Sequence, residues 1–511
     1  MSTTIAWRTA LALLGVAGAL LVLAATAHAP GVVPNSVIYL SAAESLAEGR
    51  GLVALKRVGG FGPLTHFPPL FPAMIAAPSI LGVEPLDAAR WLNAFFLGGS
   101  GVMIALLARR AGGSVARAAA AGGLFLLSQE AVQHHLFVLS EPAWLFLSLV
   151  GLYFLGGFLA GGRFHELILA STALGLALLT RYAGVALAGC GMLWLLARPR
   201  AGARTRIRNA AVFAAIAGIP MALWIVRNQM VAGTAVNRQV VFHPPEGADL
   251  AVLAQTVSDW VVPLGAPVWI KAAGIGFVVV MIALTCLGCR AQTADREQAG
   301  RQGVVRALVA TSIAAYLLLI LLVISYVDAA VTMSRRTALP VFAMILVLVF
   351  GALDPGARGE RRRAALRTAG WILVGALALF YGARYAVLAA ETRSEGLWLS
   401  GARWEGSPLV EAIERLPAGT RIYSNSVEAV YYLTRREARI LPFKVNKFLG
   451  RPNARYPEEM ERLGEELRAG GGVVAIFRRL DQESFPGVGE IESLGLARAR
   501  ETEIGILLAP R

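Results

Sequence analysis

The sequence predicts a polytopic α-helical membrane protein that ends in a small soluble α/β domain. Three observations support this fold class. Of the 511 residues, 56% are hydrophobic and only 16% are charged, whereas about a quarter of the residues of an ordinary soluble domain are charged. Apolar runs of roughly 20 residues, enough to cross a bilayer, recur along the chain. The basic residues gather in alternate short loops. This composition excludes a soluble enzyme, a disordered chain and a coiled coil.

About eleven runs are apolar enough to be transmembrane helices. They lie near residues 9–29, 88–108, 115–131, 137–160, 166–180, 183–197, 209–226, 267–288, 305–327, 337–354 and 369–388. The first run has no cleavage site of small residues that stands out, and many spans follow it. We therefore expect it to be an anchor that stays in the protein and not a cleaved signal peptide.

The arginines predict the orientation of these spans. They cluster in alternate short loops, as in Arg109, Arg110 and Arg117, and positive charge next to a span is retained in the cytoplasm. The N-terminus is then cytoplasmic, and an odd number of spans exports residues 30–87, 227–266 and 389–511. The net charge of +15 is on this interpretation a topology signal, so no nucleic-acid partner is expected.

Two domains follow from this topology. Residues 1–388 form a transmembrane module whose first exported loop covers about residues 30–87, and residues 389–511 form an extracytoplasmic α/β domain. The loop contains a helix-like run at 39–47 and, after residue 72, an apolar run too short to span that suits the membrane interface. The C-terminal domain alternates helices near 408–416, 427–434 and 457–469 with strands near 421–424, 473–477 and 503–508. Because no glycine-rich phosphate loop follows a strand, we expect it to cap the exported face and contact an acceptor, or only to pack there.

Glu141 is the most informative acidic residue of the membrane edge. It precedes Pro142 at the exported start of a span, and a charge at this depth needs a partner or a task. It is either a carboxylate that stabilises a helix N-terminus or a site acid that faces a cavity under the first loop. His134 lies nearby, which permits a divalent metal site without predicting one.

A second group of charges consists of arginines on the exported side, where the positive-inside rule predicts few. Its members are Arg181, Arg227, Arg335 and Arg336. Arginines that converge at one depth could clamp a phosphate or pyrophosphate through bidentate hydrogen bonds. The alternative is that each extends separately toward lipid headgroups.

Several of these segments resemble signatures of one enzyme group. The similar stretches are residues 35–52, 66–72, 140–142, 180–184, 224–228, 336–340 and 416–425. They resemble, in the expected order, the polyprenyl-phosphate-sugar-dependent glycosyltransferases of the GT-C fold, in the protein mannosyltransferase and aminoarabinose transferase-like branch.

This resemblance implies a multi-pass glycosyltransferase of the bacterial plasma (inner) membrane. A sugar on a polyprenyl-phosphate donor would pass with inversion to a glycan, lipid or protein acceptor on the extracytoplasmic face. The matching arginines Arg181, Arg227 and Arg336 would bind the donor phosphate, and no cofactor is implied beyond this lipid-linked donor. Tyr39, Glu44 and His66 are candidates for contacts with the acceptor or within the first loop.

One position departs from the family pattern. Where the family carries its usual aspartate base in the first exported loop, this chain has Asn35, and an amide cannot take up a proton near neutral pH. Asn35 would then orient the acceptor while Glu141, or less favourably Glu44 or Glu48, supplies the carboxylate. The alternatives are a catalytically inactive member of the family and a transporter of lipid-linked sugars, although no inverted repeat supports a transporter.

Overall fold

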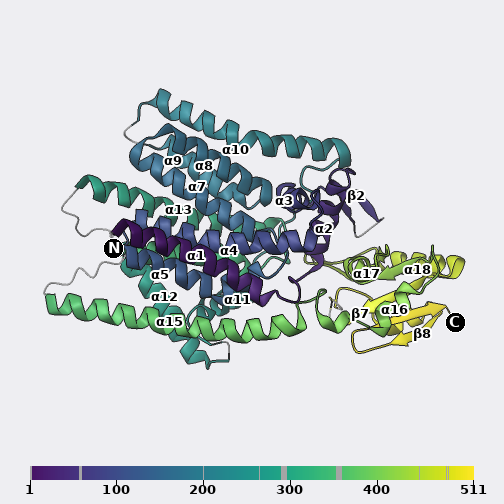
Figure 1. The fold of residues 1–511 in the computed structure, drawn as a ribbon. Coiled ribbons are helices and arrows are strands. Elements are labelled where there is room, and N and C mark those ends of the chain that lie inside the picture. The colour runs from purple at the N-terminus through teal and green to yellow at the C-terminus, as the bar shows by residue number, and fades with distance from the viewer. Residues whose placement is uncertain are drawn as a thin grey trace.

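The computed structural model describes residues 3–56, 60–198, 201–263, 265–288, 296–352, 360–447, 449–478, 480 and 483–510. It consists of a long bundle of helices with a smaller lobe of strands and helices at one end (Figure 1). The N-terminus lies at the end of the bundle away from this lobe, and the C-terminus lies in the lobe.

Each of the eleven ranges predicted as spans contains a helix. These helices are α1 (Thr3–Ala25), α4 (Pro85–Arg110), α5 (Val115–Leu127), α7 (Glu141–Gly161), α8 (Phe164–Thr180), α9 (Gly184–Leu196), α10 (Ala203–Ala232), α12 (Val268–Gly288), α13 (Arg296–Tyr326), α14 (Arg335–Ala352) and α15 (Glu360–Glu395). Among the described residues, seven helices are long and apolar enough to cross a membrane, and five shorter apolar helices accompany them. The prediction of a multi-pass helical membrane protein is confirmed.

The helices of the bundle approach one another closely where glycines face each other. A Cβ atom placed on Gly18 of α1 would lie 2.5 Å from the Cα atom of Gly98 of α4, a separation that no real side chain tolerates. Small residues at helix interfaces in membranes allow this close approach and the van der Waals packing that follows from it. These two glycines therefore fix the contact between α1 and α4.

Several elements connect the bundle to the lobe. The first long loop holds α2 (Pro34–Ala47), the antiparallel pair β1 (Val53–Leu55) and β2 (Phe61–Pro63), and α3 (Leu70–Ser79). Helix α2 is the helix expected at 39–47, and α3 is the short apolar run expected after residue 72.

The range 115–131 is divided between two helices. Ser128 ends α5, and its hydroxyl accepts a hydrogen bond from the Ala131 amide, which starts α6 (Gln129–His135). A further helix, α11 (Gly247–Asp259), was not expected.

The lobe is a five-stranded sheet with helices, as the sequence predicts for this region. Its elements are η1 (Ala402–Trp404), α16 (Pro408–Glu414), β3 (Ile422–Ser424), α17 (Val427–Thr434), β4 (Arg439–Ile440), β5 (Val445–Asn446), β6 (Arg451–Pro452), α18 (Tyr456–Gly470), β7 (Val473–Phe477), α19 (Val488–Glu492), β8 (Leu496–Glu501) and β9 (Gly505–Pro510). The strand order is β4-β3-β7-β9-β8, with β3 parallel to its two neighbours and β9 antiparallel to both of its own. The predicted domain boundary at residue 388 lies inside α15, which ends at Glu395.

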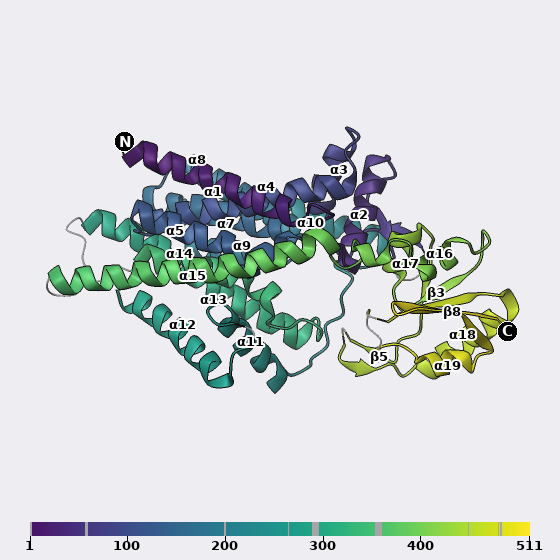
Figure 2. The same ribbon diagram turned by 60° about the horizontal axis from the view of Figure 1, so that its bottom comes forward.

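The lobe is tied to the bundle by a short three-segment bridge. Gly31 pairs with Phe137, and Val32 pairs with Trp398, so the segment before α2 lies between the segment before α7 and the segment after α15. The amide of Leu399 donates to the Val32 carbonyl at 3.1 Å. Residues of α2 and α3 also share one hydrophobic core with the lobe, which lies against this end of the bundle (Figure 2). The bridge therefore places α2 beside the start of α7.

Candidate active site

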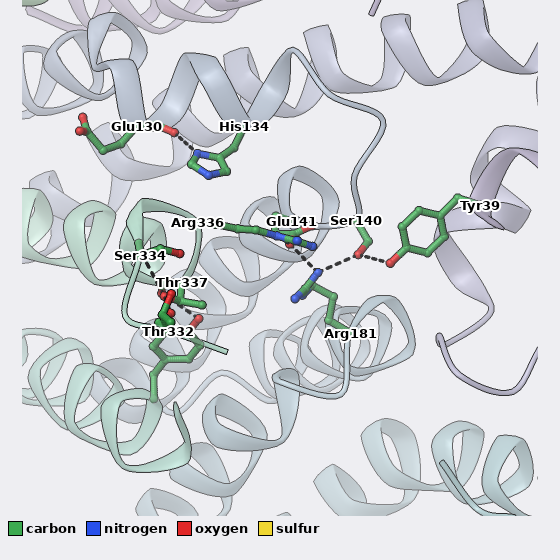
Figure 3. A network of polar contacts seen from close by, with 11 residues as sticks. Tyr39, Glu130, His134, Ser140, Glu141, Arg181, Thr332, Ser334, Arg336 and Thr337 are labelled. Carbon is green, nitrogen blue, oxygen red and sulfur yellow. Dashed lines mark hydrogen bonds and ion pairs between the residues drawn. The ribbon is translucent and has the colours of Figure 1, made fainter. Parts of the chain in front are cut away.

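A network of charged and polar side chains forms at the end of the bundle that carries the lobe. It is built from α2, the start of α7, the end of α8 and the start of α14, and Figure 3 shows these side chains pointing toward one another. Its central residue is Glu141, the first residue of α7, which is only 5% exposed. Pro142 follows it in the first helical turn, where the missing N–H costs nothing.

Glu141 is shared between two arginines. Its Oε1 atom lies 2.8 Å from Nη1 of Arg181, and the same oxygen accepts a hydrogen bond from Nε of Arg336. Arg181 is the residue that ends α8, and it has an extended backbone, while Arg336 lies in the first turn of α14. Of the four exported arginines that the sequence analysis considered as a converging group, Arg181 and Arg336 meet here, at Glu141. The carboxylate holds both guanidinium groups in place.

The network continues to the first loop through Ser140. Its hydroxyl accepts a hydrogen bond from Nη1 of Arg181 at 3.1 Å and shares another with the hydroxyl of Tyr39 at 3.0 Å. Tyr39 lies in α2, packs against the rings of Phe67 and Phe71, and is 1% exposed. Burial raises the pKa of Tyr39 to about 12, so its hydroxyl remains protonated near neutral pH. Tyr39 can therefore orient a ligand by hydrogen bonding, but it cannot act as a base.

The start of α14 is fixed by its own hydrogen bonds. The hydroxyl of Thr337 donates to the Thr332 carbonyl at 2.6 Å, and the hydroxyl of Tyr316 donates to the Thr337 carbonyl at 3.0 Å. The ring of Tyr316 in turn packs against Trp144 of α7, with centroids 5.5 Å apart. These contacts hold Arg336 opposite Glu141.

Arg335, the neighbour of Arg336, contacts a different carboxylate. Its Nη2 atom lies 2.7 Å from Oδ2 of Asp259, a buried residue at the end of α11. The Asp259 carbonyl also accepts a hydrogen bond from Arg384 of α15 at 2.8 Å. Arg335 thus joins α14 to α11, Arg384 joins α15 to α11, and Arg336 is the member of the adjacent pair that contacts Glu141.

An apolar cavity of about 530 Å³ lies between α11, α12, α13 and α14. Along α14 its wall begins at Thr337, the residue after Arg336, and continues through Ala338, Val341, Ile345 and Leu348. This spacing places one face of α14 on the cavity for about three turns. Arg336 is not among the residues that line the cavity, and at 100° per residue it lies on the opposite face of α14, toward Glu141.

The remaining residues predicted for the site lie around this network. Arg227 of α10 donates to the backbone carbonyls of Leu64 at 2.6 Å and Leu52 at 3.3 Å. Its described hydrogen bonds thus support the first loop, and none of them reaches Glu141. Asn35 lies partly exposed in the first turn of α2, four residues before Tyr39 and therefore on the same face of the helix.

Two loop residues are held by partners that the sequence prediction did not include. His66 lies against the ring of Phe67, and its Nε2 atom is 3.4 Å from Nη2 of Arg238. Arg238 also forms an ion pair with Asp328 at 2.7 Å. Glu44 of α2 forms an ion pair with Arg435 of the lobe at 3.0 Å. For the pair of Arg238 and Asp328, the sequence shows an arginine in the loop after α10 and a carboxylate in the loop after α13. Nothing in the sequence indicates that the two residues meet.

No group of three or more His, Cys, Asp or Glu side chains that could hold a metal ion is found in the described part of the chain. His134 of α6, the histidine considered for such a site, donates a hydrogen bond to a backbone carbonyl of its own helix. Its Nδ1 atom lies 2.5 Å from the Glu130 carbonyl (Figure 3).

Comparison with known proteins supports one fold and one enzyme class. Residues 54–232 match the model of the dolichyl-phosphate-mannose-protein mannosyltransferase family. No curated protein sequence matches the chain. In structure the chain is similar to ArnT from Cupriavidus metallidurans in the apo state, with a TM-score of 0.64 and 14% identity over 99% of this chain and 98% of that one. The chain has the GT-C fold.

Two further structures extend this likeness. ArnT from Cupriavidus metallidurans bound to undecaprenyl phosphate has a TM-score of 0.59 at 14% identity, over 98% of this chain and 97% of that one. The arabinofuranosyltransferase AftD from Mycobacteria has a TM-score of 0.55 at 16% identity, over 99% of this chain but only 40% of its own length. The resemblance inferred from the sequence motifs is confirmed, and membrane glycosyltransferase is the function class that these findings support.

Proposed function

We propose that this protein transfers a sugar from a polyprenyl-phosphate donor to an acceptor hydroxyl or amine, with inversion at the sugar carbon. The observation that carries this proposal is the cation pair of Arg181 and Arg336 held by the buried Glu141, on a bundle whose helix α14 lines an apolar cavity with its other face. A polyprenyl-phosphate sugar combines a phosphate with a long hydrocarbon chain, and this end of the bundle offers a complementary surface for each. The family match and the ArnT likeness support the same substrate class.

The charge of the network fits the phosphate of such a donor. Two guanidinium groups share one carboxylate, which leaves one positive charge to be balanced. A donor phosphodiester carries one negative charge, and the polyprenyl phosphate that leaves carries more, since its second pKa is near 6. The network thus stabilises the leaving group more strongly than the intact donor, which is what transition-state stabilisation requires.

The apolar cavity fits the polyprenyl chain. Its α14 wall starts one residue after Arg336 and contains no charged residue. A polyprenyl chain in this cavity would bury isoprene units against Ala338, Val341 and Ile345. Burial of apolar surface contributes roughly 25 cal/mol per Å², so the chain supplies binding energy while the arginines position the phosphate.

The acceptor would then lie at the network, between α2 and α6. Asn35 and Tyr39 lie on one face of that helix, and Tyr39 reaches the network through Ser140. We propose that Asn35 orients the acceptor through its amide and that Glu141 fixes the two cations. Arg227 contributes by holding the first loop, and His66 and Glu44 by contacts within the loop and with the lobe.

We infer the cellular placement from topology and likeness together. The arginine-rich short loops favour a cytoplasmic N-terminus, which puts the network and the lobe on the extracytoplasmic side. A neighbour of bacterial origin with matching length supports the bacterial plasma membrane as the location. The acceptor would then be a glycan, lipid or protein of the cell envelope.

The decisive experiment uses purified protein in detergent. Binding of undecaprenyl phosphate is measured first, followed by transfer of labelled sugar from a panel of undecaprenyl-phosphate-linked sugars. We expect wild-type protein to bind and transfer, and Arg336→Gln to weaken binding at least about tenfold, since a charge-assisted hydrogen bond is worth roughly 1.5–3 kcal/mol. Equal binding by Arg336→Gln would contradict the placement of the phosphate. Binding and movement of the lipid without sugar transfer would favour the transporter alternative.

A further inference from the structure

Helix α6 carries two consecutive histidines whose rings make the same hydrogen bond in different surroundings. Nδ1 of His134 lies 2.5 Å from the Glu130 carbonyl oxygen, and Nδ1 of His135 lies 2.6 Å from the Ala131 carbonyl oxygen. A carbonyl oxygen only accepts hydrogen bonds, so each Nδ1 atom must carry the hydrogen. Each neutral ring therefore has its lone pair on Nε2. The two residues differ in where that lone pair is located.

The Nε2 lone pair of His134 is on the side of the charged network. His134 is 8% exposed, whereas His135 is completely buried and its Nε2 atom has no hydrogen-bond partner. In Figure 3 the imidazole of His134 projects from α6 on the side of Arg336 and Glu141.

The proposed reaction needs a proton acceptor that the family position does not supply. Asn35 is an amide, and the buried hydroxyl of Tyr39 is already protonated. Glu141 shares its Oε1 atom between Arg181 and Arg336, and a proton on this carboxyl group would have to compete with two cations. Among the described side chains of the network, His134 is the neutral one with a basic lone pair.

We propose that His134 is the general base that accepts the proton of the acceptor nucleophile. This inference rests on the proposed glycosyltransferase function. In the step, the acceptor oxygen or nitrogen forms a bond to the anomeric carbon of the sugar, and the bond between that carbon and the phosphate oxygen breaks. The bonding electrons leave with the polyprenyl phosphate beside Arg181 and Arg336. The proton of the nucleophile passes to Nε2 of His134, which becomes an imidazolium near the Glu141 carboxylate.

The surrounding charges set the protonation state of His134 before the reaction. Burial lowers its pKa, and the cations Arg335 and Arg336 of α14 act in the same direction, while the Glu130 carbonyl and Glu141 of α7 act in the opposite one. Arg384 of α15 acts on the side chain of Glu130 in the same helix. The net effect is a pKa below the ordinary value, so the ring is neutral and ready to accept a proton near pH 7. The rate of sugar transfer should therefore fall only at pH values below the pKa of His134.

The experiment compares His134→Asn with His135→Asn. The amide of an asparagine can keep the hydrogen bond that Nδ1 makes in either position, but it has no basic nitrogen. We measure kcat/KM for sugar transfer as a function of pH, together with binding of undecaprenyl phosphate and elution of the folded protein in detergent. Loss of a general base typically reduces the rate by about 10²–10⁴-fold.

The expected result is a loss of that size in His134→Asn with undecaprenyl phosphate binding unchanged, and the acid limb of the pH profile should vanish from its residual activity. His135→Asn should keep the wild-type rate and the wild-type decrease of kcat/KM at acid pH. The inference is overturned if His134→Asn transfers sugar at a wild-type rate, if its acid limb persists, or if binding falls in parallel with transfer. Absence of transfer by wild-type protein would overturn the proposed function as well, which distinguishes the two failures.

Discussion

Arg435 of the lobe forms an ion pair with Glu44 of α2, with 3.0 Å between Nη1 and Oε1. Arg435 has a left-handed backbone, with φ of 57°, which is uncommon for a residue other than glycine, asparagine or aspartate. The hydroxyl of Tyr431 donates to the same carboxylate at 3.3 Å, and its ring packs against Phe61 of the first loop. Since α2 also carries Tyr39, the lobe contacts the helix that forms one wall of the candidate site.

This contact predicts that the lobe influences transfer through α2. We expect Glu44→Gln and Arg435→Asn each to reduce kcat/KM a few-fold, because exposed ion pairs are worth about 0.2–1 kcal/mol. Asparagine is chosen because it tolerates the left-handed conformation. The double variant should lose no more than either single one, because both remove the same contact. Additive losses would show that the two residues act separately. Arg415→Gln, which removes an exposed pair with Glu411 elsewhere in the lobe, is the control.

Glu141 should be required both for stability and for donor binding. Replacing it with glutamine leaves two guanidinium groups close together without their shared carboxylate, so we expect a loss of about 2 kcal/mol in the free energy of unfolding. Binding of undecaprenyl phosphate should weaken as well, because the two arginines are no longer held in one geometry. Thermal unfolding and a binding titration on the same sample measure both effects.

The chain contains a matched control for that experiment. Glu166 is 2% exposed and is likewise shared by two arginines, Arg110 at 3.0 Å and Arg163 at 2.6 Å. It lies in the first turn of α8, at the opposite end of that helix from Arg181. Glu166→Gln should therefore destabilise the protein by a similar amount without changing undecaprenyl phosphate binding. If both variants lost binding equally, the effect of Glu141 would be one of general stability.

The apolar cavity predicts dependence on the length of the lipid chain. Ala338→Phe adds a ring to the α14 wall one turn into the bundle. We expect it to weaken binding of undecaprenyl phosphate at least about tenfold, because roughly 1.5 kcal/mol of apolar burial is blocked, and to leave a short-chain polyprenyl phosphate almost unaffected. Leu223→Phe on the exposed face of α10 adds a similar ring elsewhere in the membrane and should change neither. Equal effects of Ala338→Phe on both lipids would place the chain outside this cavity.

The sequence predicts the helices of this protein better than it predicts their contacts. Apolar runs mark the helices, because burial in lipid requires them, and the two cations Arg181 and Arg336 stand out because they violate a charge rule. The division of 115–131 was missed because Ser128 interrupts the run without making it polar. The ion pair of Arg238 with Asp328 joins two loops 90 positions apart in the sequence. No local sequence pattern indicates a contact between residues so far apart. Arg227, like Arg181, stands out as an arginine on the exported side. Its backbone hydrogen-bond partners could not be inferred from residue type.

Asn35→Asp should raise the rate of transfer. Asn35 lies in the first turn of α2 on the face that carries Tyr39, so an aspartate there places a carboxylate on the α2 side of the network. A negative charge at this end of a helix is also stabilising, by about 0.3–1 kcal/mol, so the variant should fold at least as well as wild type. We expect about a tenfold gain in kcat, less than the roughly 10²–10⁴-fold that a fully positioned base contributes, whereas Asn35→Gln should give no gain. If the new carboxylate acts as a base, Asn35→Asp should also restore transfer to the His134→Asn variant. A fall in rate with unchanged thermal stability would instead show that the amide itself is needed to orient the acceptor.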